Sequence, residues 1–280
     1  VVDAHVGSWL GYRWFIATDC DVMDVKLPDL QVPDGVLNLD TLRSVTARLF
    51  DPLGLLSEVT LQLRCMMKTL HDMGYGTGEH ASLGVELRSS EQEYVMEVLQ
   101  RCNDYLSSDR VLPPRYVDLS EVWMYADASE MAMAWDMRDK VGTRVEAKVI
   151  TSRHGSIPLR ELEALRLAVV ALERLVTMKT TGVVRATVMS DSTITLHRLR
   201  WVLTDRHSAK VEALPQPEYR RLQHICDLVG NIRRAAPTCE LLFQHVRSSA
   251  NLADRLTRPG DIEEPIGDWD EVSNEVMIDP

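Results

Sequence analysis

The sequence predicts an α/β fold in which helices flank a mixed sheet, preceded by a mainly helical region. Two observations predict this class. From residue 121 to residue 152, three strand-like segments follow one another with short loops, which is typical of an antiparallel meander. From residue 157 to residue 246, helical segments then alternate with strand-like ones, which is typical of a sheet covered by helices.

The first 110 residues are expected to fold separately from this sheet. Residues 1–30 are typical of a β-hairpin, and helices are expected to start at residue 39 and to cover 57–72 and about 90–106. Pro113 and Pro114 exclude a helix there, so we expect the domain boundary near residue 110. The chain thus divides into residues 1–110, residues 111–260 and an acidic tail of residues 261–280.

Capping residues mark the helix starts of the first part. Asp40 and Thr41 are the candidate N-caps of the first helix. Asp51 opens an Asp-Pro-Leu-Gly turn, in which proline fixes φ and glycine permits a positive φ. We therefore expect Asp51 to cap the next helix rather than to take part in catalysis.

The composition is that of a soluble globular protein, with 45% hydrophobic and 26% charged residues. No apolar run approaches the roughly 20 residues that cross a bilayer, and we expect no signal peptide. The first residue is Val, which suggests a piece of a longer chain. The five cysteines are scattered and never spaced as C-x-x-C, which argues against a zinc site and indicates a reducing compartment.

The net charge of -11 is unevenly distributed along the chain. Residues 121–260 hold 21 Lys and Arg against 16 Asp and Glu, whereas residues 1–120 hold 10 against 18. The last 20 residues hold eight acids and no Lys or Arg, so a solvated linker is expected there. The basic middle segment is compatible with a phosphate backbone as a partner, although a solvated surface explains it almost as well.

Four acids lie where strands end or helices begin. Asp127 closes the first strand of the sheet, and Asp191 closes a later strand in the same way. Glu161 is expected in the first turn of the helix that begins near Pro158, and Asp254 in the first turn of a closing helix. Taken singly, each acid has a common structural explanation as a helix cap or a partner of the helix dipole.

Taken together, the four acids predict a metal site. On one edge of a sheet they would repel one another, raise their pKa values and destabilise the fold unless cations neutralise them. Carboxylate oxygens are the ligands that Mg²⁺ and Mn²⁺ prefer. Two such ions, roughly 4 Å apart, can activate a water molecule and stabilise the leaving oxygen when a phosphodiester is hydrolysed.

Short motifs occur in a fixed order along the chain. They are Arg43 to Leu56 ending in F-D-P-L-G-L-L, Pro114-Arg115, Asp127-Ala128-Ser129, Ser152-Arg153, I-P-x-x-E-L at 157–162, Asp191-Ser192 and N-x-A-D-x-x-x-R at 251–258. The order of elements and of the acids Asp, Glu, Asp, Asp resembles the ribonuclease H fold. Over about residues 7–260 the chain resembles a BEL/Pao-type LTR retrotransposon polyprotein.

The resemblance implies that Asp127, Glu161, Asp191 and Asp254 hold two Mg²⁺ or Mn²⁺ ions and cut the RNA strand of an RNA–DNA hybrid. Residues 1–110 would belong to the thumb and connection region of a reverse transcriptase, whose Y-x-D-D motif is absent from this sequence. The implied partners are the hybrid and the rest of the reverse transcriptase and integrase polyprotein, with no membrane. The implied location is a cytoplasmic retrotransposon particle, or the nucleus.

The sequence departs from the family pattern at two places. In the loop before the last acid, many ribonucleases H have a histidine, whereas this chain has Ser248 and Ser249. The nearest histidine, His245, lies on the preceding strand and is expected to be structural. Residues 131–135 replace the usual A-x-G strand, so a narrower groove for the hybrid is expected.

Two alternatives to an active ribonuclease H remain. One is an inactivated or domesticated copy that keeps the fold as a scaffold or interaction module. The other is an integrase catalytic core, which shares the fold but should end its set of acids with a Glu on a late helix.

Overall fold

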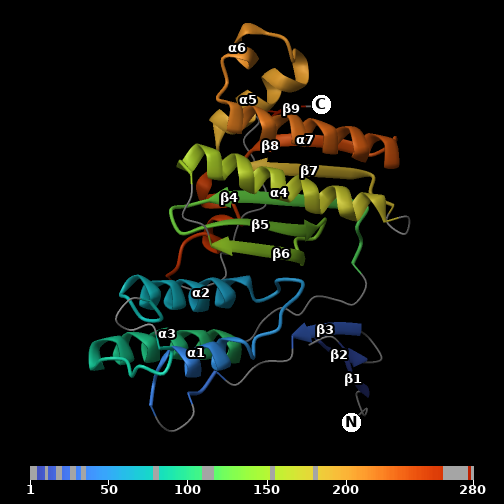
Figure 1. Cartoon of the computed structure of the whole chain (residues 1–280). Coiled ribbons are helices and arrows are strands. Elements are labelled where there is room, and N and C mark those ends of the chain that lie inside the picture. Colours follow the sequence, from blue (N-terminus) through green and yellow to red (C-terminus); the bar gives the residue numbers. More distant parts are fainter. Residues whose placement is uncertain are drawn as a thin grey trace. The chain divides into compact units, whose positions relative to one another are not determined.

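The structure is a computed structural model that describes residues 5–9, 12–16, 21–25, 30–32, 36–77, 82–108, 117–151, 155–178, 182–260 and 277–278 (Figure 1). The chain divides into two compact units. Unit 1 comprises residues 1–116 and 259–264, and unit 2 comprises residues 117–258 and 265–280. The boundary predicted near residue 110 lies outside the described residues, as do Pro114-Arg115 and Ser152-Arg153. Among the described helices, none has the length and apolar character needed to span a membrane.

Unit 1 joins a small sheet to three helices. The sheet is antiparallel, in the order β1-β2-β3, and therefore extends the predicted hairpin by one strand. The core of unit 1 is formed by the buried faces of the helices, with Leu42, Met66 and Leu99 among the enclosed side chains. The elements are β1 (His5–Trp9), β2 (Tyr12–Ile16), β3 (Asp21–Val25), α1 (Leu39–Thr46), α2 (Ser57–Asp72) and α3 (Ser89–Ser107).

Side-chain oxygens accept backbone N–H groups at or just before two of the helix starts in unit 1. The N-cap of α1 is Asn38, not Asp40 or Thr41 as predicted, because the Oδ1 of Asn38 accepts the amide N–H of Thr41 at 2.9 Å. Asp51 accepts the amide N–H groups of residues 55 and 56 at 2.9 and 2.6 Å, just before α2 begins. The prediction that Asp51 caps this helix was wrong, because the N-cap of α2 is Leu56 and makes no side-chain capping hydrogen bond. Asp51 instead stabilises the turn before the helix, in which Gly54 has φ of 70°.

Unit 2 is built on a six-stranded mixed sheet in the order β6-β5-β4-β7-β8-β9. The antiparallel pairing of β4, β5 and β6 confirms the predicted meander. β7 and β8 run parallel to β4, and β9 pairs antiparallel with β8. The strands are β4 (Glu121–Ala128), β5 (Ala132–Asp139), β6 (Arg144–Thr151), β7 (Arg185–Ser190), β8 (Glu240–His245) and β9 (Met277–Ile278).

Four helices and two 3₁₀ turns complete the described part of unit 2. They are α4 (Ile157–Thr177), α5 (Thr193–Thr204), α6 (Ala209–Glu212), α7 (Gln216–Ala235), η1 (Ser248–Ala250) and η2 (Asp254–Leu256). The short helix α6 lies in the connection between α5 and α7. One prediction for this part of the chain was wrong. The predicted closing helix at Asp254 is only the single turn η2, since Pro259 cannot continue a helix and Gly260 disfavours it.

The main core of unit 2 lies between the sheet and the helices α4, α5 and α7, of which α4 and α7 run along one face of the sheet in Figure 1. One face of α4 is apolar and buried, with these residues at helical spacing: Leu162, Leu165, Val169, Leu172 and Val176. On β4, Val122, Met124 and Ala126 face this core. Because side chains alternate along a strand, Tyr125 and Asp127 face the opposite side of the sheet.

A charged cluster is buried within the antiparallel strands. Asp136 on β5 is fully buried and accepts hydrogen bonds from Arg138 at 2.9 Å and from Arg144 at 2.7 Å. The two guanidinium groups hold the pKa of Asp136 down at about 2 against the opposing effect of its burial. The carboxylate is therefore ionised at neutral pH and balances part of the arginine charge.

Part of the acidic tail joins the sheet. Met277 and Ile278 pair with Gln244 and Phe243 of β8, and Ile278 is 5% exposed. These two residues are therefore not a solvated linker, whereas residues 261–276 lie outside the described residues.

Candidate metal centre

Two of the predicted acids meet because they end neighbouring parallel strands. In the register of β4 and β7, Ala126 lies opposite Ser190. Asp127 directly follows Ala126, and Asp191 directly follows Ser190. The two acids therefore lie next to each other at the carboxyl ends of these parallel strands. Adjacent strands are about 4.8 Å apart, which leaves little distance between the two carboxylates. The carboxyl ends of parallel strands are the usual place for ligand sites in open α/β sheets.

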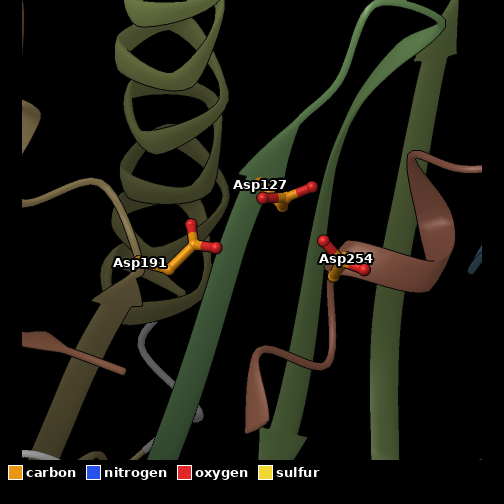
Figure 2. A group of neighbouring side chains, drawn as sticks. All are labelled: Asp127, Asp191 and Asp254. Carbon is orange, nitrogen blue, oxygen red and sulfur yellow. The ribbon is translucent and has the colours of Figure 1, made fainter. Parts of the chain in front are cut away.

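The third acid, Asp254, lies close to the end of the continuous stretch 117–258 of unit 2. Asp254 is the first residue of η2, and this turn contacts β4 and β5. One carboxylate oxygen from each of Asp127, Asp191 and Asp254 lies within 4.8 Å of the other two. Figure 2 shows Asp127 between the other two side chains. Each of these three acids is more than 60 residues from the next one along the chain, and the fold brings them together.

The fourth predicted acid lies beside this group but is not a member of it. The hydroxyl of Ser192, directly after Asp191, donates a 2.5 Å hydrogen bond to Oε2 of Glu161. The negative charge of Asp191 also helps to raise the pKa of Glu161, after the larger effect of burial. Glu161 is the fifth residue of α4, so the prediction that it lies in the first turn was wrong.

The neighbouring Glu163 has arginine partners. Its carboxylate is half-buried and forms ion pairs with Arg166 at 2.6 Å and with Arg221 of α7 at 2.8 Å. The two arginines lower the pKa of Glu163 in spite of its burial. Glu163 therefore links α4 to α7 by an ion pair. Of these two glutamates, Glu161 is the one whose carboxylate interacts with Asp191.

Burial and mutual repulsion perturb the acids of the group. Burial raises the pKa of Asp127 to about 6, with further contributions from the charges of Asp191 and Asp254. The pKa of Asp254 is also raised, mainly by burial. Arg258 opposes both shifts and lies 2.7 Å from Oδ1 of Asp254. The arrangement is electrostatically costly for three ionised carboxylates.

Hydroxyl groups orient two of these carboxylates. Ser248 donates a short hydrogen bond to Oδ2 of Asp191. This serine lies in the loop before the last acid, where many ribonucleases H have a histidine. Thr257 donates a short hydrogen bond to Oδ2 of Asp127. Sequence reasoning missed Thr257, whose only signal was its place inside the N-x-A-D-x-x-x-R motif. His245 is the last residue of β8, opposite Ser190.

The donor set fits a hard divalent cation. All three members of the group offer carboxylate oxygens, which Mg²⁺ and Mn²⁺ prefer over nitrogen or sulfur ligands. A cation among them would also reverse the repulsion that raises the pKa of Asp127. Asp127, Asp191 and Asp254 are therefore the residues that would hold a metal, with Glu161 adjacent.

A three-stranded antiparallel meander, two further parallel strands, helices along one face and carboxylates at the strand ends define a ribonuclease H-like domain. The chain belongs to the family of the Pao retrotransposon RNaseH-like domain, whose family model matches residues 40–197. This match includes Asp127, Glu161 and Asp191 and ends before Asp254. No curated protein matches the chain.

Several solved structures are similar at low sequence identity. A foamy viral protease-reverse transcriptase in complex with double-stranded DNA is 12% identical, with a TM-score of 0.48, and the match covers 85% of this chain and 37% of that one. RNase H1 from the halophilic archaeon Halobacterium salinarum NRC-1 is 15% identical, with a TM-score of 0.33, over 47% of this chain and 87% of that one. LC11-RNase H1 in complex with an RNA/DNA hybrid is 14% identical, with a TM-score of 0.32, over the same shares of the two chains. The chain thus spans little more than a third of the foamy viral protein.

Proposed function

We propose that unit 2 is a metal-dependent endoribonuclease of the ribonuclease H type, which hydrolyses the RNA strand of RNA–DNA hybrids during reverse transcription of a retrotransposon. The observation that carries the proposal is the meeting of Asp127, Asp191 and Asp254 within 4.8 Å, from three separate elements of a domain of this family. A scaffold would gain nothing from gathering three carboxylates that repel one another. An integrase core is less well supported, because the closing acid is Asp254 on a 3₁₀ turn rather than a Glu on a helix.

The chemistry divides between the chain and the bound ions. Two divalent ions, when bound, supply an activated water molecule and stabilise the leaving oxygen of the phosphodiester. Asp127 contributes a buried carboxylate on a rigid strand, and Asp191 and Asp254 contribute less buried ones on either side. Glu161 adds a fourth negative charge, which the Ser192 hydroxyl holds in place. The raised pKa of Asp127 means that the chain binds cations best above about pH 6, where this carboxylate is ionised.

The remaining assignments follow from the family. We propose that residues 1–110 belong to the thumb and connection region of the reverse transcriptase, and that the rest of the polyprotein is a partner. The working location would be a retrotransposon particle in the cytoplasm, or the nucleus. Within unit 2, the excess of basic residues over 121–260 supports binding to a phosphate backbone.

The proposal is tested by incubating the full chain with an RNA–DNA hybrid labelled separately on each strand, with Mg²⁺ or with EDTA. Cleavage of the RNA strand in Mg²⁺ alone is expected. Asp191→Asn should abolish it, because it removes the negative charge of one of the three carboxylates in the group. The matched control Asp227→Asn changes an exposed acid of α7 and should cleave like the wild type.

Each result separates the competing functions. A wild-type protein that neither cleaves the hybrid nor binds Mg²⁺ or Mn²⁺ in a calorimetric titration would show that the scaffold alternative is right. Full cleavage by Asp191→Asn would refute the assignment of this residue. Cleavage of double-stranded DNA at the same rate would contradict the proposed substrate.

A further inference from the structure

The segment that carries Asp254, residues 251–258, has little secondary structure of its own. The three-residue 3₁₀ turn η2 (Asp254–Leu256) is the one regular element within these described residues. A short 3₁₀ turn has poorer hydrogen-bond geometry than an α-helix, so it cannot by itself hold a side chain in place. The position of Asp254 must therefore depend on contacts with the rest of unit 2.

Two contacts fasten this segment to the end of β4, one on each side of Asp254. Three residues before it, the buried Asn251 donates a 3.2 Å hydrogen bond from Nδ2 to the carbonyl of Ala126. Three residues after it, the carbonyl of Thr257 accepts a 2.5 Å hydrogen bond from the hydroxyl of Ser129. The segment is therefore held against the residues on either side of Asp127.

Ser129 is itself fixed from the helix side. Arg160 of α4 is 4% exposed and donates a 2.6 Å hydrogen bond from Nη1 to the carbonyl of Ser129. The hydroxyl of Ser129 also accepts the amide N–H of Met131 at 3.0 Å. These two hydrogen bonds therefore hold Ser129, whose hydroxyl binds the carbonyl of Thr257, in a fixed position.

The hydroxyl of Thr257 makes the direct link between two of the acids. Thr257 is 0% exposed, and its Oγ1 lies in hydrogen-bond contact with Oδ2 of Asp127 and 2.8 Å from the carbonyl of Asp254. A hydroxyl has one proton, and an ionised carboxylate is the stronger acceptor. The proton is thus donated to Asp127, and this bond limits the rotation of its carboxylate.

We propose that Thr257 is a positioning residue of the metal centre. Its hydroxyl sets the orientation of the Asp127 carboxylate, and its backbone holds the Asp254 turn at the distance at which both acids can share a cation. The proposal rests on the proposed function, since it concerns the same centre. It assigns to Thr257 a role that acts through Asp127 and not through contact with substrate.

The test compares Mn²⁺ binding by full-length variants in the absence of nucleic acid, measured by isothermal titration calorimetry. Thr257→Val replaces the hydroxyl by a methyl group and should weaken Mn²⁺ binding about 10–100-fold, as the loss of a group that orients a metal ligand does elsewhere. Thr257→Ser keeps the hydroxyl and should bind within about threefold of the wild type by the same reasoning. The matched control Thr187→Val removes a buried threonine hydroxyl from β7, four residues before Asp191, and should leave the affinity unchanged.

A second measurement separates positioning from folding. Urea unfolding in EDTA checks that each variant is folded, and Thr257→Ala repeats the test if valine prevents folding, since it adds no methyl group. Equal Mn²⁺ affinity of wild type and Thr257→Val, or loss of affinity in Thr257→Ser as large as in Thr257→Val, would overturn the proposal. The proposed function fails by a different result, namely a wild type that binds no metal and cleaves no hybrid.

Discussion

Replacement of Asp127 by Asn should change how the stability of the metal-free protein depends on pH. The pKa of Asp127 is about 6 in the folded chain and close to 3.8 in the unfolded one. A carboxyl whose pKa is higher in the folded state binds more protons when folded. The free energy of unfolding of the wild type should therefore fall as the pH rises from about 4 to about 6, and this loss should level off above the folded pKa.

The magnitude follows from the size of the shift. At about 1.4 kcal/mol for each pKa unit, the rise to about 6 costs the ionised, metal-free protein about 3 kcal/mol in full. Asp127→Asn lacks this cost because its amide does not titrate, and it can still accept the hydrogen bond from Thr257. The difference between the two proteins should thus change by about 3 kcal/mol from pH 3 to pH 8, in favour of the variant.

The assay is urea unfolding of both proteins in EDTA at a series of pH values, followed by tryptophan fluorescence. Contributions from unit 1 and from acids with lowered pKa values are common to both proteins and cancel in the difference. Parallel curves for wild type and Asp127→Asn would refute the reasoning. Mn²⁺ at 100 times its dissociation constant should return about 3 kcal/mol to the wild type at pH 7 and much less to the variant.

The remaining predictions concern the fold and the fourth acid. Asp136→Asn should lower the free energy of unfolding by about 3–5 kcal/mol, because it leaves two buried arginines without their carboxylate. Its control, Lys140→Ala, breaks an exposed ion pair and should leave the urea midpoint unchanged. Phe243→Ala empties a 0% exposed site on β8 and should cost about 3–5 kcal/mol in the same assay. Glu161→Gln should slow hybrid cleavage about 10–100-fold, whereas Glu163→Gln should cleave normally; equal rates for the two variants would contradict the role given to Glu161.

Much of unit 2 could be predicted because its signals are local. Three strand-like segments joined by short loops predicted the meander of β4, β5 and β6, and Pro158 predicted the start of α4. Asp127 and Asp191 could be paired from the sequence, since each ends an apolar strand. Their proximity needed only that the two strands be parallel neighbours, which is the commonest result of a strand, helix and strand in series.

The errors arose where several residues compete or where a contact is distant in sequence. Asn38, Asp40 and Thr41 are all good N-caps, and only the backbone conformation selects Asn38. The closing helix was predicted from the first turn alone, although Pro259 stops it. The hydrogen bond from Thr257 to Asp127 joins residues 130 positions apart, and no periodic pattern marks such a pair.

The wide spacing of the acids has a consequence for synthesis of the chain. Asp127 and Asp191 can meet as soon as β4 and β7 have paired, but Asp254 arrives only after the rest of the sheet up to β8 has been made. Chains emerge from the ribosome at about 5–20 residues per second, and contacts between distant segments form late. A growing chain therefore holds an incomplete set of carboxylates until its closing turn docks. The nascent domain should bind divalent ions weakly and be inert toward nucleic acid until it is almost complete.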